Sequence, residues 1–228
     1  MMKKFAMLFG ALLVLCNMAS ANPKGGTFIG VNVGVPITNP TYNGLIEQMS
    51  DYFPTRGTGW AFGLELGYKQ MFSQNFGLRY YVDYYYGSAS GDKRAYVGFV
   101  SLTTKATIVQ HRIAANIDAL LYFTQRFGAY VGVGLGYQGY DPSYTFNGQS
   151  NFVGGTGTAL GPLSMPNHGL QGGLAIPINV GIMLDFGENS QLTLGAKIGT
   201  LGYDYELDAN SKVGLSSYLV KLGYSYTF

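Results

Sequence analysis

Nine charged residues lie at alternate positions within otherwise apolar segments, and of all side chains in the sequence they are best placed to do chemistry. The cations are Lys69, Arg79, Arg112, Lys197 and Lys221, and the anions are Glu65, Asp83, Asp118 and Asp185. Enclosed charges of opposite sign either pair with one another or line a narrow aqueous path that selects ions. Both signs are present in nearly equal number, which suits pairing better than a selectivity ring. We therefore expect an ion-pair network that plugs an interior, with a pore as the alternative.

Signals for catalysis, cofactors or metals are weak by comparison. Ser164 and His168 are close in sequence, but no carboxylate stands near them and no nucleophile motif surrounds the serine. The glycine-rich residues 154–157 do not follow a strand and open a helix, as a phosphate-binding loop would. No spacing of Cys, His or carboxylates indicates a metal site. The sequence thus predicts a protein that is neither an enzyme nor cofactor-dependent.

Side-chain alternation with period two, typical of β-strands, runs through eight segments. They are residues 27–35, 58–69, 76–87, 111–123, 127–137, 173–186, 191–200 and 217–228. Each is close to the roughly 9–11 residues that a tilted strand needs to cross the hydrocarbon layer. Pro177 lies within the sixth segment and cannot donate a ladder hydrogen bond, so we expect a bulge there or a shorter strand.

The connections between these segments alternate in length. Those of 70–75, 124–126 and 187–190 are short, and those of 36–57, 88–110, 138–172 and 201–216 are long. This pattern predicts an all-β fold, an eight-stranded antiparallel transmembrane β-barrel with short periplasmic turns and four long extracellular loops. Residues 45–52 have the pattern of a short amphipathic helix, and the third loop, rich in Gly, Ser, Asn and Thr, is expected to be mobile.

A soluble β-sandwich is the alternative fold for the same alternation. Glycines recur on the polar side of the strands, among them Gly63, Gly67, Gly132, Gly181 and Gly195. A solvated strand face has no need of so many glycines, whereas the interior of a narrow barrel needs small residues. Aromatic residues also mark both ends of the segments, as headgroup-level girdles do. The pattern therefore favours the barrel.

The first residues have the features of an export signal. Lys3 and Lys4 precede an apolar run, and residues 19–21 read Ala-Ser-Ala, so residues 1–21 are expected to be removed and 22–228 to form the barrel. Acylation at Cys16 is the alternative, disfavoured by the large Leu15. Without Lys3 and Lys4 the fourteen basic residues become twelve, which equals the acidic count. We therefore expect no nucleic-acid partner.

The last segment ends on alternating aromatic residues, Tyr224, Tyr226 and Phe228. Transmembrane barrels characteristically end on such a strand, and we expect these residues to be the signal that the barrel-assembly machinery recognises. Outer-membrane lipids are the other expected partner.

Several segments resemble the Helicobacter outer-membrane protein family. Residues 179–201 are similar to its penultimate hairpin, residues 77–89 to its Tyr-rich strand and residues 116–123 to its "DLLYNF" strand. The resemblance implies an outer-membrane location. Larger members carry an extracellular adhesion domain, often with cysteines, which this chain lacks, and other members are porins. We expect a structural or adhesion-type protein with a host or surface ligand at its extracellular loops; a small channel is the alternative.

Overall fold

The computed structural model describes residues 23–97, 100–150, 159–164 and 169–228. The predicted signal peptide, the glycine-rich residues 154–157 and His168 lie outside these ranges.

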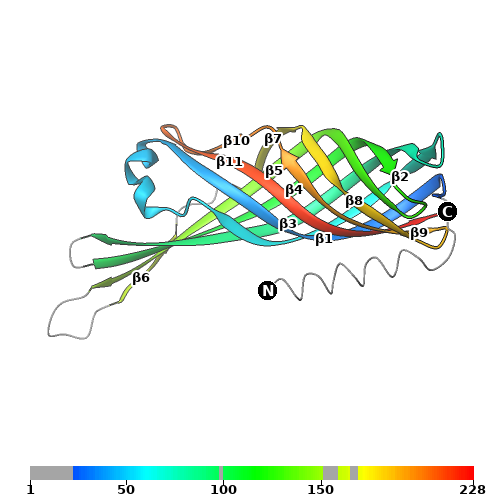
Figure 1. Cartoon of the computed structure of the whole chain (residues 1–228). Helices are drawn as coiled ribbons and strands as arrows, with labels where there is room; N and C mark the ends of the chain where they lie inside the picture. The colour runs from blue at the N-terminus through cyan, green and yellow to red at the C-terminus, as the bar shows by residue number, and fades with distance from the viewer. Residues whose placement is uncertain (1–22, 98–99, 151–158, 165–168) are drawn as a thin grey trace, which may run out of the picture.

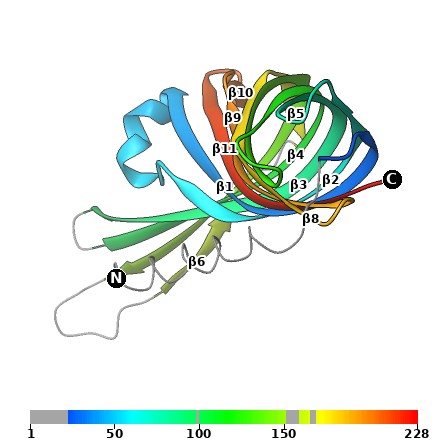
Figure 2. The ribbon, with the colours of Figure 1, turned by 45° about the vertical axis from the view of Figure 1, so that its right-hand side comes forward.

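Eight strand positions form a closed antiparallel ring, as predicted (Figures 1 and 2). In ring order they are β1 (Gly26–Gly44), β2 (Gly57–Met71), β3 (Phe76–Val97), β4 (Val100–Tyr122), β5 (Phe127–Ser150), β8 (Pro177–Phe186), β9 (Ser190–Gly199) and β11 (Ser211–Thr227). β11 pairs with β9 on one side and with β1 on the other, and this last pairing closes the barrel.

Four further elements occupy the end of the barrel away from the short turns. They are the 3-10 helix η1 (Leu45–Tyr52) and strands β6 (Ala159–Ser164), β7 (Gln171–Ala175) and β10 (Tyr203–Asp208). η1 forms where the sequence has the pattern of a short amphipathic helix, and its turns are of the 3-10 type. No helix among the described residues is both long and apolar enough to cross a membrane.

The extents of the four long connections were predicted wrongly, because much of their chain is strand rather than loop. β3 continues to Val97 and β4 starts at Val100, so the predicted loop of 88–110 is a hairpin. β1 and β5 also run far past their predicted ends, and β10 pairs with β11 within 201–216. Strands that leave the bilayer keep their ladder hydrogen bonds but lose the lipid environment that makes one face apolar, so alternation no longer reports them.

Pro177 interrupts a strand position, as expected. β8 begins at Pro177 and is shorter than predicted, while β7 ends at Ala175. Both pair with β5, and the register passes across the gap without a shift, from Val133 opposite Ile178 to Gly136 opposite Ala175. The break accommodates a residue that has no N–H to donate.

The two faces of the barrel wall are opposite in character. Aliphatic side chains point outward and are about half exposed, such as Val31 at 45% and Val33 at 57%. Inward positions carry polar, small or aromatic residues. Gly181 and Gly195 are required beside Tyr130, because a Cβ at either position would collide with the tyrosine hydroxyl. An apolar outer face and a more polar interior are expected for a barrel wall that is surrounded by lipid.

Aromatic residues form two girdles on the outward face, as predicted. Trp60 and Tyr86 make an edge contact with ring centroids 5.6 Å apart near the outer end, where Tyr86 also contacts His111 at 4.9 Å. At the end with the short turns, Phe123 contacts Phe127 with centroids 5.9 Å apart. The aliphatic band between the girdles is the membrane-spanning part.

The outer end of the barrel contains a hydrophobic cluster, which we call the outer cluster. Its buried members are Tyr42, Ile46, Phe53, Ala106, Ile108, Tyr140, Tyr144, Tyr205, Val213 and Leu215. Phe53 lies at its centre, 4.9 Å from Tyr42 and 5.6 Å from Tyr144 between ring centroids. The Tyr42 hydroxyl donates to the Pro54 carbonyl at 2.7 Å. Burial raises the pKa of Tyr42 and of Tyr144 above the ordinary value, so both stay neutral at the outer end of the barrel.

Candidate functional site

All nine predicted charged residues lie inside the barrel, each at most 5% exposed. They come from β2, β3, β4, β8, β9 and β11, at the positions of each strand that point inward. A charge enclosed in this way is costly unless it is paired and hydrogen-bonded. The contacts of these residues therefore decide what the interior can do.

Arg79 and Asp118 form an ion pair of 2.6 Å between neighbouring strands. They sit directly opposite each other in the β3–β4 register. The Arg79 guanidinium also lies over the Tyr81 and Tyr130 rings, 4.9 and 4.8 Å from their centroids. Aromatic faces on a desolvated guanidinium add cation–π attraction and fill the space around it.

Two further ion pairs reach across the interior. Lys221 donates to Glu65 at 2.5 Å, and the Tyr85 hydroxyl donates to the same carboxylate at 3.1 Å. Lys197 pairs with Asp83. Asp83 is on β3 and Lys197 on β9, and three strand positions separate them in either direction around the ring. The second pair therefore spans the barrel between opposite walls.

Two asparagines join these ion pairs into one network. Asn116 accepts from Lys197 at 2.9 Å and from the Asn179 amide at 3.1 Å. Asn179 also donates to Asp118 at 2.9 Å. The two amides thus connect the Arg79–Asp118 pair with the Lys197–Asp83 pair. Side-chain alternation in the sequence also places both asparagines on the inward side of their strands.

A separate group lies nearer the periplasmic turns. Gln191 donates to Asp185 at 2.6 Å and to the Tyr122 hydroxyl at 3.0 Å. Lys69 attracts Asp185 electrostatically from β2. Gln191 was not among the predicted network residues, although the alternation of the sequence places it on the inward side of β9 and could have identified it.

Arg112 stands apart from these pairs, toward the outer end. Its guanidinium lies over the Tyr85 ring at 5.0 Å. Beyond it, Gln110 accepts from Ser217 at 2.8 Å and from Gln138 at 3.3 Å. Sequence reasoning missed Gln110 and Gln138 because both fell in stretches predicted to be loops.

The predicted assembly residues line the outside of the last strand. Tyr224, Tyr226 and Phe228 are 43%, 40% and 64% exposed. Tyr226 and Phe228 make an edge contact at 5.3 Å, and the Phe228 amide donates to the Thr27 carbonyl at 2.8 Å. Their rings thus form an exposed patch at the periplasmic end of the β1–β11 seam.

Of the two residues considered for catalysis, His168 lies outside the described residues. His111 points outward, where its Nδ1 lies 2.8 Å from the Tyr84 hydroxyl. Ser164 is exposed at the end of β6. Within the described ranges, no group of three or more His, Cys, Asp or Glu residues is arranged to hold a metal ion.

A family model described as "Helicobacter outer membrane protein" matches residues 63–228. The chain belongs to this family. The match includes β3 to β11, and the family places the protein in the outer membrane, as the sequence predicted. A search of curated proteins finds no match.

Solved structures of outer-membrane barrels are similar to this chain at low identity. Neisserial surface protein A has 13% identity and a TM-score of 0.45, covering 89% of this chain and 97% of its own. OprG of Pseudomonas aeruginosa has 14% identity and a TM-score of 0.47, covering 91% and 98%. Ail of Yersinia pestis has 12% identity and a TM-score of 0.39, covering 89% and 99%. Because these identities and TM-scores are low, we assign the barrel architecture from the strand pairing of this chain and not from the similarity.

Replacement of Arg79 by alanine tests the network. Arg79→Ala leaves Asp118 enclosed without its cation, and breaking one side of a buried pair costs about 3–5 kcal/mol. We expect the barrel to unfold at a lower temperature, measured by its heat-dependent shift in gel mobility. Lys105→Ala, which removes an exposed cation of β4, is the control and should leave the shift unchanged. Identical unfolding of the Arg79→Ala and wild-type barrels would contradict a stabilising network.

Proposed function

We propose that this protein is a non-conducting barrel with a structural or adhesion-type surface role in the outer membrane. The observation that carries the proposal is the Lys197–Asp83 ion pair, which joins opposite walls of the ring. Tyr81 and Tyr85 lie beside it, with ring centroids 5.3 and 5.6 Å from the Lys197 ammonium. An eight-stranded barrel has an interior just wide enough for side chains, so a pair that crosses it leaves little room for solute.

The outer cluster supports the proposal with a second barrier in series. Phe53 and Tyr144 pack edge to face at the mouth, and Ile46 of η1 is buried against the same cluster. An ion entering from outside would meet apolar rings before it reached the charged interior. A desolvated path of this kind opposes ion conduction.

The part of the chain that can meet another molecule lies beyond this mouth. Residues 91–97 of β3, 100–107 of β4 and 143–150 of β5 form with β6 a sheet that extends past the rim, which we call the projecting sheet (Figure 1). Pairing of β2 with β3 stops at Ser90, so the β3 side of this sheet has a free edge among the described residues. Edge strands and exposed side chains such as Tyr96, 67% exposed, are suited to contacts with a host or surface ligand.

A small channel for ions or solutes is the alternative function, and it requires the Lys197–Asp83 pair to separate.

An enzymatic role has less support than either of these functions. His111, the histidine within the described residues, is engaged by Tyr84 on the outward face rather than facing the interior. Barrel hydrolysis needs a base beside a nucleophile or an activated water.

Single-channel recording tests the closed interior. We expect the folded barrel in a planar bilayer to give no stable current, because charged pairs and aromatic rings fill the lumen. Folding is checked in the same sample by the heat-dependent gel shift. Ohmic steps whose ion selectivity changes in Lys197→Gln or Arg79→Gln would establish a pore and refute the non-conducting barrel.

Shortening the projecting sheet tests the surface role. Replacing residues 92–105 with an Asn-Gly turn joins Gly91 to Ala106, which are partners in the β3–β4 register, and so preserves the hairpin below. Vesicles carrying this variant should bind cultured host epithelial cells several-fold less than vesicles carrying the wild type. Empty vesicles give the background, and the heat shift checks the barrel. Equal binding by both proteins, or wild-type binding at background, would refute the adhesion-type role of the sheet.

We further infer that the aromatic patch of Tyr224, Tyr226 and Phe228 is recognised by the barrel-assembly machinery. Phe228→Ala should lower the folded fraction in isolated outer membranes, because it removes an exposed ring at the strand end. Phe123→Ala is a matched control, since Phe123 is 63% exposed and Phe228 is 64% exposed. Equal folded fractions of Phe228→Ala and Phe123→Ala would show that a ring on the last strand matters no more for assembly than an equally exposed ring elsewhere, which would contradict this inference.

A further inference from the structure

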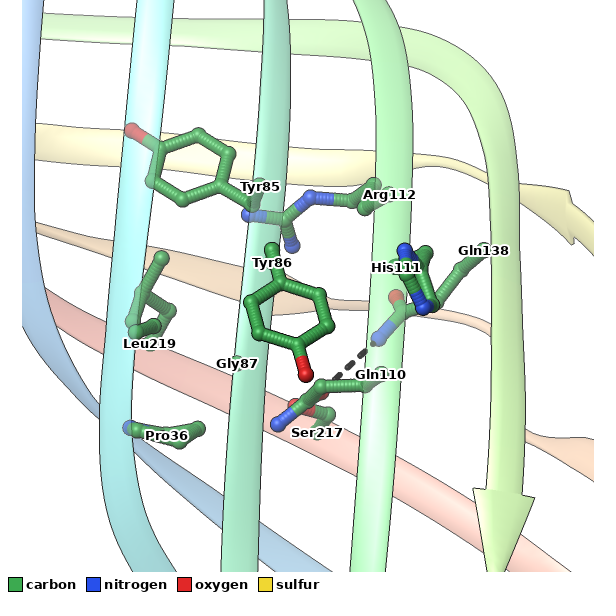
Figure 3. Close-up of a pocket in the computed structure, with 11 residues that line it drawn as sticks. Pro36, Tyr85, Tyr86, Gly87, Gln110, His111, Arg112, Gln138, Ser217 and Leu219 are labelled. Carbon is green, nitrogen blue, oxygen red and sulfur yellow. Dashed lines mark hydrogen bonds between the residues drawn. The ribbon is translucent and has the colours of Figure 1, made fainter.

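A small cavity lies inside the barrel between the ion-pair network and the outer cluster. Residues of β1, β2, β3, β4, β5 and β11 line it, and the inward-facing polar side chains among them are Tyr85, Gln110, Arg112, Gln138 and Ser217 (Figure 3). Its volume, measured as the space open to the centre of a water-sized sphere, is about 20 Å³. One water molecule itself occupies about 10–15 Å³, so the cavity has room for a single particle of that size or slightly larger.

The cation beside this cavity is the one that the network does not neutralise. Three of the other interior cations form ion pairs, and Lys69 lies in the field of Asp185. Arg112 has no carboxylate partner among the described residues and is 5% exposed, and its Nε–H finds no acceptor there. Arg126, another buried cation, lies in the turn between β4 and β5 at the opposite end of the barrel. A positive charge enclosed without a counter-charge is strongly unfavourable.

Gln110 brings a second free donor to the same cavity. Its Oε1 is already engaged by Ser217 and Gln138. Its Nε2 has no acceptor among the described residues, and the side chain is 8% exposed. Two enclosed side chains thus offer N–H groups to one space, and one of them carries a charge. A water molecule would accept these hydrogen bonds but would leave the charge unbalanced.

We propose that this cavity binds one small inorganic anion of the size of chloride. Arg112 supplies the charge and an N–H donor, and Gln110 supplies a second donor. The Tyr85 ring beneath the guanidinium holds Arg112 in place. The anion completes the charge balance of the outer half of the interior, and the site does not depend on whether the barrel conducts.

Chloride-dependent unfolding tests the site in the barrel purified from membranes. The wild type is unfolded in urea in sodium chloride and in sodium gluconate at equal ionic strength, since gluconate is too large for the cavity. A ligand that binds only the folded state divides the unfolding equilibrium constant by 1 + [L]/Kd, so each tenfold rise in chloride above Kd should lower that constant about tenfold. Arg112→Gln should lose this dependence, and Lys105→Gln, a control that removes an exposed cation of the same strand, should keep it.

Gln110→Glu is the second variant, and it decides the question if Arg112→Gln fails to fold. A carboxylate beside Arg112 replaces the anion, so this barrel should be folded and insensitive to chloride. Crystals grown in bromide should show an anomalous peak beside Arg112 in the wild type and none in Gln110→Glu. Wild-type stability equal in chloride and gluconate would overturn the proposal, as would chloride dependence that persists in Gln110→Glu or the absence of a bromide peak at Arg112.

Discussion

Hydrocarbon offers no hydrogen-bond partners, so every backbone N–H and C=O within the bilayer must be paired by the protein. The β1–β11 ladder meets this requirement where an open sheet would fail. It runs without a register shift from Phe28 opposite Thr227 to Gly44 opposite Ser211. Because this ladder joins the first strand to the last, the wall has no free edge in lipid. Contact with the same hydrocarbon also accounts for the outward aliphatic band, and contact with the lipid headgroups accounts for the two aromatic girdles.

Closure with eight strands makes the interior narrow, and this decides its chemistry. Side chains from opposite walls touch, as Asp83 and Lys197 do, so most inward charges meet a partner rather than bulk water. Bulky rings such as Tyr130 on β5 fit because the next two strands of the ring, β8 and β9, carry glycine at Gly181 and Gly195. The uncommon composition of the strands, rich in both glycine and tyrosine, is therefore a packing requirement of a thin barrel.

Beyond the outer girdle the constraint from lipid ends, and the strands are free to differ in length. β3, β4 and β5 continue into the projecting sheet, whereas β1 is followed by η1, whose Ile46 is buried in the outer cluster. Water there satisfies exposed edges that hydrocarbon could not. The molecule thus divides into a wall determined by the bilayer and an outer part available for contacts with other molecules.

The sequence by itself determined the strand count, the short turns, the inward and outward faces and the interior location of the charges. It could do so because a wall between lipid and a packed interior imposes opposite chemistry on alternate residues. Past the bilayer that contrast disappears, so the outer halves of the strands, with Gln110 and Gln138, were predicted as loops. The pairing of Lys197 with Asp83 and the isolation of Arg112 were decided only by tertiary structure. Alternation shows which way a side chain points, but the strand stagger of the closed ring sets which residues meet across it.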